Sequence, residues 1–246
     1  MKEAKRLADD GIYLNENRSD NPKEMFKFIR SVVSSKRLNS ASTLLDVGCA
    51  TGELIYYLKC NHPNLSCTGV DVSNAMIKLA KTRQPNESFV CGNILTKKNQ
   101  KMSQYDIVIC AGVLQIFDDI ELPIQNLLSS VSPFGMLVVA GSFNNHNIDV
   151  LMRYRSGGSR DIAGWETGWN LFSKETIERC LKKYGKHLSW NWFDFEMPFP
   201  LPEKEDPMRT WTISTEHNSN QLINGAAQLL YTKVLCVSVG RIDHNV

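Results

Sequence analysis

The strongest fold signal in the chain is an alternation, through its first 140 residues, of short apolar runs with segments of helical periodicity. The apolar runs are nearly continuous, which is typical of parallel strands covered on both faces. We predict strands at 43–47, 66–71, 88–91, 105–110 and 136–140. We predict helices at 25–33, 53–59, 74–81 and 122–131. Strands and helices in this order predict an α/β fold with a doubly wound, mostly parallel sheet.

Composition and charge exclude several classes of protein. Hydrophobic residues make up 42% of the 246 residues and the net charge is +2, as in an ordinary globular protein and not a dedicated nucleic-acid scaffold. The N-terminus has no apolar segment of the signal-peptide type, and apolar runs such as 136–140 are too short to cross a membrane. The seven cysteines are scattered without a CxxC pair, so we expect no metal and a reduced, cytoplasmic protein.

A turn of small residues follows the first predicted strand. Gly48, Ala50 and Gly52 lead into a helix whose N-terminal N–H groups can bind a carboxylate or a phosphate. Glycine suits a backbone that turns sharply or lies against a ligand. A dinucleotide site would read GxGxxG, and no third glycine stands at the required offset. The phosphate-loop pattern is absent, because Glu53 follows Gly52.

This turn resembles motif I of the class I S-adenosylmethionine-dependent methyltransferases. Asp46, Gly48, Ala50 and Gly52 occupy the positions of its (D/E)xGxGxG pattern, with Ala50 replacing the central glycine. The resemblance extends over residues 41–142. It implies a Rossmann-like fold with a seven-stranded sheet, S-adenosylmethionine as cofactor and S-adenosylhomocysteine as product.

Three further stretches support this resemblance and imply roles for individual residues. Asp71, at the end of the second strand, would accept hydrogen bonds from the ribose hydroxyls, and Met76 would pack on the adenine. Asn93 stands where the family has an aspartate that accepts a hydrogen bond from the adenine amino group. The amide oxygen of an asparagine can accept the same hydrogen bond. The segment 105–114 resembles the fourth motif. The complete cofactor set is Asp46, Gly48, Ala50, Gly52, Asp71, Val72, Met76, Asn93, Ile94 and Ala111. The alternatives are a plain turn for Gly48, Gly52 and Asn93, a helix cap for Asp71, and a core position for Met76.

The rest of the chain would bind the acceptor. We predict a loop at 144–170, a helix at 173–184, a strand at 187–195 and a buried terminal strand at 233–239. No linker divides the chain, so we expect one domain over 1–246: an N-terminal helical or lid segment at 1–40, a cofactor-binding half at 41–142, and an elaborated acceptor-binding half at 143–246. The candidate acceptor residues are Tyr13, His146, Arg153, Trp165 and Trp169.

Methyl transfer mainly requires alignment and exclusion of water, so the lack of an evident catalytic residue does not argue against an enzyme. No catalytic residue is assigned. The motif typical of methyltransferases that act on amino groups of nucleic-acid bases is missing after the fourth strand, which disfavours nucleic acid. We therefore predict a small-molecule methyltransferase with oxygen as the acceptor atom. The alternatives are a cofactor-binding protein without transferase activity and a methyltransferase acting on RNA or protein. We expect no membrane partner. The sequence leaves the oligomeric state open.

Overall fold

The computed structural model describes residues 10–15, 20–95, 104–155, 165–184, 188–205 and 209–225. The chain divides into two compact units, Met1–Phe195 and Glu196–Val246. The expectation of a single domain over 1–246 stays a prediction.

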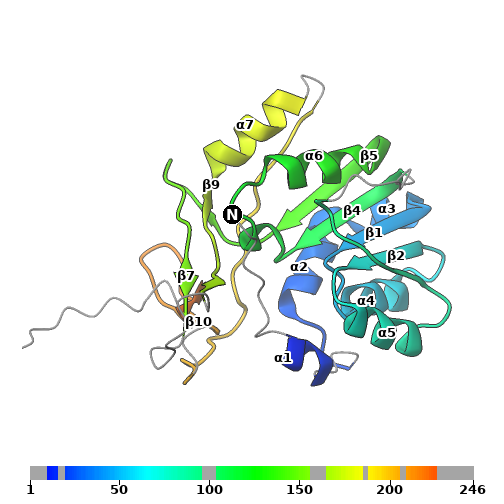
Figure 1. The fold of residues 1–246 in the computed structure, drawn as a ribbon, viewed down its shortest axis with the longest axis horizontal. Coiled ribbons are helices and arrows are strands. Elements are labelled where there is room, and N and C mark those ends of the chain that lie inside the picture. The colour runs from blue at the N-terminus through cyan, green and yellow to red at the C-terminus, as the bar shows by residue number, and fades with distance from the viewer. Residues whose placement is uncertain are drawn as a thin grey trace, which may run out of the picture. The chain divides into compact units, whose positions relative to one another are not determined.

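A parallel sheet forms the centre of the first unit (Figure 1). Its strands are β1 (Thr43–Val47), β2 (Ser66–Asp71), β3 (Ser88–Cys91), β4 (Tyr105–Ala111) and β5 (Val131–Ala140). They are ordered β3-β2-β1-β4-β5, and every neighbouring pair is parallel. The predicted doubly wound α/β fold is confirmed. The sheet has five strands in the described residues where seven were expected, and the predicted strand at 233–239 lies outside them.

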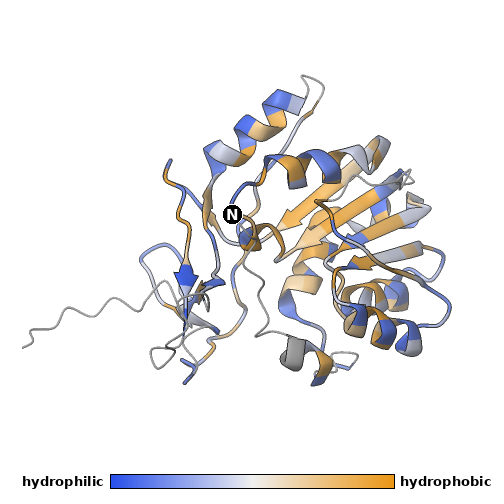
Figure 2. Cartoon of the chain, viewed as in Figure 1, coloured by the Kyte–Doolittle hydropathy of each residue, from blue (hydrophilic) through white to orange (hydrophobic). Residues whose placement is uncertain are grey.

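Helices cover both faces of this sheet, as the continuous apolar strands require (Figures 1 and 2). The helices are α1 (Asp10–Asn15), α2 (Glu24–Val33), α3 (Ser35–Ser40), α4 (Glu53–Asn61), α5 (Asn74–Arg83), the 3₁₀ turn η1 (Leu114–Ile116), α6 (Glu121–Ser129) and α7 (Lys174–Tyr184). One core contains buried residues of α2, α4 and α5, and the other contains those of α6 and α7. The central strands β1 and β4 contribute to both cores, which explains their apolar runs.

The amino ends of three strands are joined by one carboxylate. Asp106 accepts hydrogen bonds from the backbone N–H groups of Ser42 and Thr43, at 2.8 and 3.0 Å, and from the hydroxyl of Ser132 at 3.2 Å. These bonds, the first to Ser42, hold the pKa of Asp106 below its ordinary value. The edge opposite the cavity described below is therefore fixed by charge-assisted hydrogen bonds.

The segment after β5 departs from two predictions. The predicted loop at 144–170 includes the two-residue strands β6 (Phe143–Asn144), β7 (Arg153–Tyr154) and β8 (Glu166–Thr167), and β9 (Phe172–Ser173) follows it. The predicted strand at 187–195 is wrong, because residues 188–195 form no regular element. Two indole rings of this segment lie against α7 instead: the Trp192 Nε1 donates to Glu178 at 3.0 Å, and Lys182 lies 5.9 Å from the Trp190 ring.

The second unit contains an antiparallel hairpin. Its strands are β10 (Thr210–Ile213) and β11 (Gln221–Asn224), and Trp211 of β10 is buried. In the whole described part of the chain, no helix combines the length and the apolar character needed to cross a bilayer.

Candidate functional site

A cavity of about 780 Å³ lies at the carboxyl ends of the strands. Its lining includes the segments that follow β1, β2, β3 and β4, together with residues of α1 and α2. In the order β3-β2-β1-β4-β5 the chain reverses its direction of growth between β1 and β4, and open α/β sheets bind ligands at such a point. The volume falls within the range of about 300–1,000 Å³ that is usual for small-molecule sites.

The turn after β1 forms the middle of the cavity wall. Gly48 has a φ of +77°, and a Cβ at this position would lie 2.2 Å from the Val113 Cγ2, so only glycine fits. Ala50 also has a positive φ, of 47°, where the resembling family has glycine. The Ala50 N–H donates to Asp71 Oδ2 at 2.9 Å, and this bond supports a conformation that is costly for alanine.

Gly52 lies outside the cavity lining. It begins α4 with a φ of +81°, and a Cβ there would lie 2.6 Å from Gln84 Nε2 and 2.8 Å from the Phe89 ring. Gln84 also donates to the Gly52 carbonyl at 2.8 Å. Backbone conformation and packing explain the glycine at this position without a ligand.

Asp71 connects the turns after β1 and β2. Its Oδ2 accepts the Ala50 N–H, and its Oδ1 accepts the Ser73 N–H at 2.8 Å. A carboxylate has about four lone-pair sites, so two backbone bonds leave acceptor capacity toward the cavity that Asp71 lines. The Ser73 hydroxyl caps α5 by accepting the Met76 N–H at 3.4 Å.

Asp46, the last but one residue of β1, is a buried carboxylate that lines the cavity. Only 3% of its surface is exposed, and no side-chain hydrogen bond is found for it among the described residues. Burial, and then the charge of Asp71, raises the pKa of Asp46 to about 7. A ligand that carries positive charge would stabilise the ionised form of this pair.

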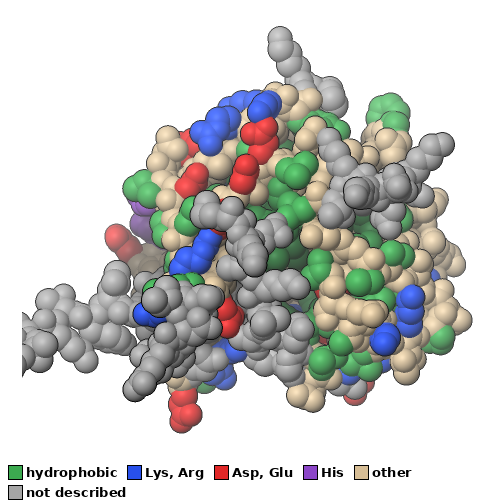
Figure 3. Space-filling model, viewed as in Figure 1, with side chains coloured by type: hydrophobic (Ala, Val, Ile, Leu, Met, Phe, Trp, Pro, Cys, Tyr) green, Lys and Arg blue, Asp and Glu red, His purple; other side chains and the backbone are tan. Residues whose placement is uncertain are grey.

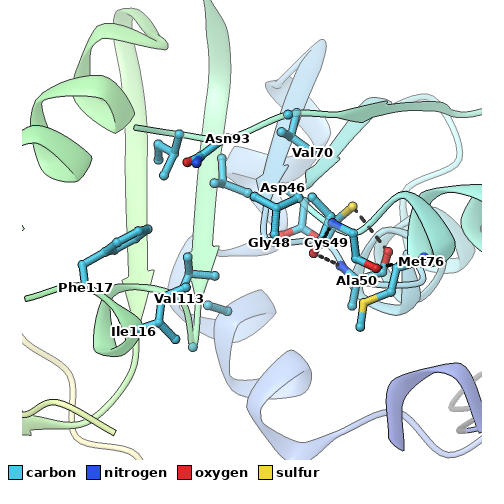
Figure 4. Close-up of a pocket in the computed structure, with 18 of the residues that line it drawn as sticks. Asp46, Gly48, Cys49, Ala50, Val70, Met76, Asn93, Val113, Ile116 and Phe117 are labelled. Carbon is cyan, nitrogen blue, oxygen red and sulfur yellow. Dashed lines mark hydrogen bonds between the residues drawn. The ribbon is translucent and has the colours of Figure 1, made fainter. Parts of the chain in front are cut away.

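The other residues predicted to bind the cofactor meet at the same cavity. Val72, Met76, Asn93, Ile94 and Ala111 all belong to its lining. Figure 4 shows Ala50 and Met76 at one end of the group and Phe117 at the other. The Asn93 Oδ1 accepts the Leu95 N–H at 2.9 Å, so part of this amide's hydrogen-bonding capacity already shapes the turn after β3.

The residues predicted to bind the acceptor are divided. Tyr13 and Trp169 line the cavity, whereas His146, Arg153 and Trp165 do not. His146 is exposed, and Trp165 is 44% exposed with the Arg155 guanidinium 4.7 Å from its ring centre.

Arg153 does not line the cavity itself, but it pairs with Asp118, which does. Its guanidinium forms an ion pair with Asp118 and donates to the Met152 carbonyl at 2.8 Å. The second Asp118 oxygen accepts the Asn170 Nδ2 at 3.2 Å. Asn170 is fully buried and also donates to the Phe117 carbonyl at 2.6 Å, so it ties the loop after η1 to the segment before β9.

Sequence reasoning missed several residues of the lining. The missed residues are Lys23, Phe26, Val47, Cys49, Glu53, Leu54, Val70, Ser73, Gly92, Leu95, Gly112, Val113, Ile116, Phe117, Asp118, Asp119, Leu122 and Thr167. The position of Phe117 to Asp119, just beyond the fourth strand, was an available signal. No signal marked Thr167, since only packing of the segment after β7 brings it to the cavity.

The described residues show no metal centre or reactive thiol at this site. No cluster of three or more His, Cys, Asp or Glu side chains suited to a metal ion is found within the ranges that the structure describes. Burial, with Asp46 and Asp71 adding to it, raises the pKa of the Cys49 thiol, which therefore stays protonated and is a poor nucleophile. The arrangement can hold and align a ligand rather than form a covalent intermediate.

Comparisons with known proteins give independent evidence of the family. A family model described as a methyltransferase domain matches residues 17–187. A malonyl-[acyl-carrier protein] O-methyltransferase of Priestia megaterium is 30% identical over 192 residues, which cover 76% of this chain and 67% of that protein. A trans-aconitate 2-methyltransferase of Paracidovorax citrulli is 30% identical over 102 residues, which cover 42% of this chain but only 39% of that protein.

A solved structure agrees in fold. The sugar N-methyltransferase KedS8 from Streptoalloteichus sp. ATCC 53650 superimposes with a TM-score of 0.50 at 20% identity, covering 74% of this chain and 85% of that one. At this identity the likeness concerns the fold alone.

Proposed function

The chain belongs to the class I S-adenosylmethionine-dependent methyltransferases, and from this membership we propose that it methylates an oxygen atom of a small-molecule acceptor. The observation that carries the proposal is the meeting of Asp46, Gly48, Asp71, Met76 and Asn93 at one cavity. The malonyl-[acyl-carrier protein] relative is named an O-methyltransferase, which supports oxygen as the methylated atom.

The residues present suit the cofactor. S-Adenosylmethionine, when bound, supplies a methyl group on a positively charged sulfonium whose leaving group is a neutral thioether. The buried Asp46 carboxylate, beside Asp71, favours a cationic ligand. Asp71 would accept the ribose hydroxyls, Met76 would contact the adenine, and the Gly48 backbone lets the ligand approach without a Cβ between them.

The protein's contribution to the reaction is positioning. The turn after β1 and the loop that Asn170 holds would keep cofactor and acceptor in line, and the apolar side chains of that loop would exclude water. A hydroxyl acceptor must also lose its proton, and Asp118 and Asp119 are the carboxylates that the loop supplies to the lining.

Nucleic acid is a weaker alternative as acceptor. The net charge is +2, and in the face shown in Figure 3 the coloured Lys and Arg side chains lie among Asp and Glu. Ion pairs such as Lys183 with Glu121 illustrate this mixing. A binding surface for the phosphate backbone would instead concentrate one sign of charge.

Calorimetric titration of the full chain with S-adenosylhomocysteine tests the cofactor assignment, with NAD as the control. We expect micromolar binding of the first and none of the second. An acceptor panel, with S-adenosylhomocysteine formation as the readout, then tests transfer. Binding of NAD alone would refute the proposal, and binding of S-adenosylhomocysteine without turnover of any acceptor would support the non-catalytic alternative.

A further inference from the structure

Among the described residues that line the cavity, the charged side chains are nearly all acidic. Among the described residues that line it, the acids are Asp46, Glu53, Asp71, Asp118 and Asp119, and the only base is Lys23. The Lys23 ammonium lies 4.0 Å from Glu53 and 4.8 Å from the centre of the Tyr13 ring. Its charge is thus already balanced, so among the described lining residues no basic side chain is left to pair with an entering carboxylate.

Arg153, which pairs with a lining residue, does not change this balance. Arg153 forms an ion pair with Asp118, and its Nη1 donates a hydrogen bond to the Met152 carbonyl. Asp118 is oriented in turn by Asn170. The pair is therefore neutral as a unit, and freeing Arg153 for a substrate carboxylate would leave Asp118 as an additional negative charge on the cavity wall.

Beyond the cofactor residues, the lining also contains a group of large apolar and aromatic side chains. Its members are Tyr13, Phe26, Ile116, Phe117, Leu122 and Trp169. Figure 4 shows Ile116 and Phe117 on the loop after β4, at the end of the cavity away from Met76. Aromatic side chains favour flat apolar ligands, which they contact through ring faces and edges.

We propose that the acceptor is an uncharged, flat, largely apolar molecule that is methylated on a phenolic hydroxyl, and that free carboxylic acids are rejected. This inference rests on the proposed function and specifies the substrate class of the same site. In the transfer, a bond forms between the phenolic oxygen and the methyl carbon while the carbon–sulfur bond breaks and leaves its electron pair on sulfur. The hydroxyl proton passes through the lining carboxylates to solvent.

The test uses matched pairs of phenolic acids and their methyl esters, such as 4-hydroxybenzoate and methyl 4-hydroxybenzoate. Each pair shares the hydroxyl and the ring, so it isolates the effect of one negative charge. The probes are titrated into the full chain saturated with S-adenosylhomocysteine, and transfer is measured separately with S-adenosylmethionine. We expect the esters to bind at least about tenfold more tightly than the acids and to be the methylated members. Equal binding, tighter binding of the acids, or binding of neither overturns the proposal.

The variant Asp119→Asn tests whether the negative charge of the cavity lining causes the preference for esters over acids. Asp119 Oδ1 accepts the Glu121 N–H at 2.8 Å, and an asparagine oxygen can accept the same bond, so the start of α6 is preserved. We expect the ester-to-acid affinity ratio to fall by about threefold, the scale of removing one charge at moderate distance in a partly hydrated site. An unchanged ratio in a variant that binds S-adenosylhomocysteine normally would refute the electrostatic explanation.

The two proposals fail in different ways. If the wild-type chain does not bind S-adenosylhomocysteine, the proposed function fails before any acceptor is tested. If it binds S-adenosylhomocysteine but shows no preference for the esters, only the acceptor class is wrong.

Discussion

Replacing Asp46 by asparagine should stabilise the ligand-free protein and weaken cofactor binding. The pKa of Asp46 is raised from 3.8 to about 7, mainly by burial. The folded state therefore binds more protons than the unfolded state between these values, and stability falls as pH rises through this window. Asparagine keeps the shape of the side chain but cannot ionise.

The magnitude follows from the shift. About three pKa units at ~1.36 kcal/mol each correspond to about 4 kcal/mol of lost stability when Asp46 is fully ionised. By the same relation, ionisation of Asp46 lowers the free energy of unfolding by about 2 kcal/mol at pH 5 and by about 4 kcal/mol at pH 8. The advantage of Asp46→Asn over the wild type should therefore grow by about 2–3 kcal/mol between these pH values.

Urea unfolding of both proteins at pH 5 and pH 8, without ligand, measures this difference. Calorimetry should show that the variant binds S-adenosylmethionine at least about tenfold more weakly, because the buried negative charge that favours a cationic ligand is lost. A pH-independent difference between the two proteins would show that Asp46 is not protonated more readily in the folded state, and the reasoning would be wrong.

Asp106→Asn is the matched control with the opposite sign. The pKa of Asp106 is lowered by its hydrogen bonds, the first from Ser42, so it stabilises the fold above its unfolded pKa and loses this effect as pH falls. The variant should be less stable than the wild type at pH 8 and should approach it at acidic pH.

Three other substitutions address the turn after β1, the buried histidine at the end of α4 and the loop after η1. Gly48→Ala should weaken S-adenosylhomocysteine binding at least about tenfold in calorimetry, and adding Val113→Ala should restore only part of it, since the clash is relieved but the positive φ remains. Burial, and then the charge of Arg30, lower the pKa of His62, so between pH 7 and pH 5 the unfolded state binds more protons than the folded state. The free energy of unfolding measured with urea should therefore fall less over this range in His62→Gln than in the wild type. Asn170→Ala should speed amide hydrogen exchange in residues 114–119 while leaving the S-adenosylhomocysteine affinity within about twofold, and unchanged exchange would contradict the anchoring role.

The sequence was most informative where the determinants are local. Continuous apolar runs identify the strands β1 to β5. The small residues from Gly48 to Gly52 predict the turn, and the order of strands and helices predicts a parallel sheet with its ligand edge at the strand ends. Each of these signals depends on backbone preference or on burial of a single element, both of which are written in neighbouring residues.

Tertiary structure decided what depends on contacts between distant segments. The alternating pattern at 187–195 predicts a strand, but residues 188–195 form no regular element, and Trp190 and Trp192 contact α7 instead. Gly52 matches the family motif yet packs on Phe89, outside the cavity.

The electrostatic character of the site was likewise settled by packing across elements. The Asp46–Asp71 pair, the Arg153–Asp118 ion pair and the meeting of Phe117 with Trp169 at one cavity join residues that lie far apart in the chain. The sequence by itself therefore determined the scaffold and the half of the site that resembles the family motifs. The charge and shape of the acceptor end emerged only when separate segments came together, because a side chain's burial and neighbours are properties of the packed chain and not of the residues beside it.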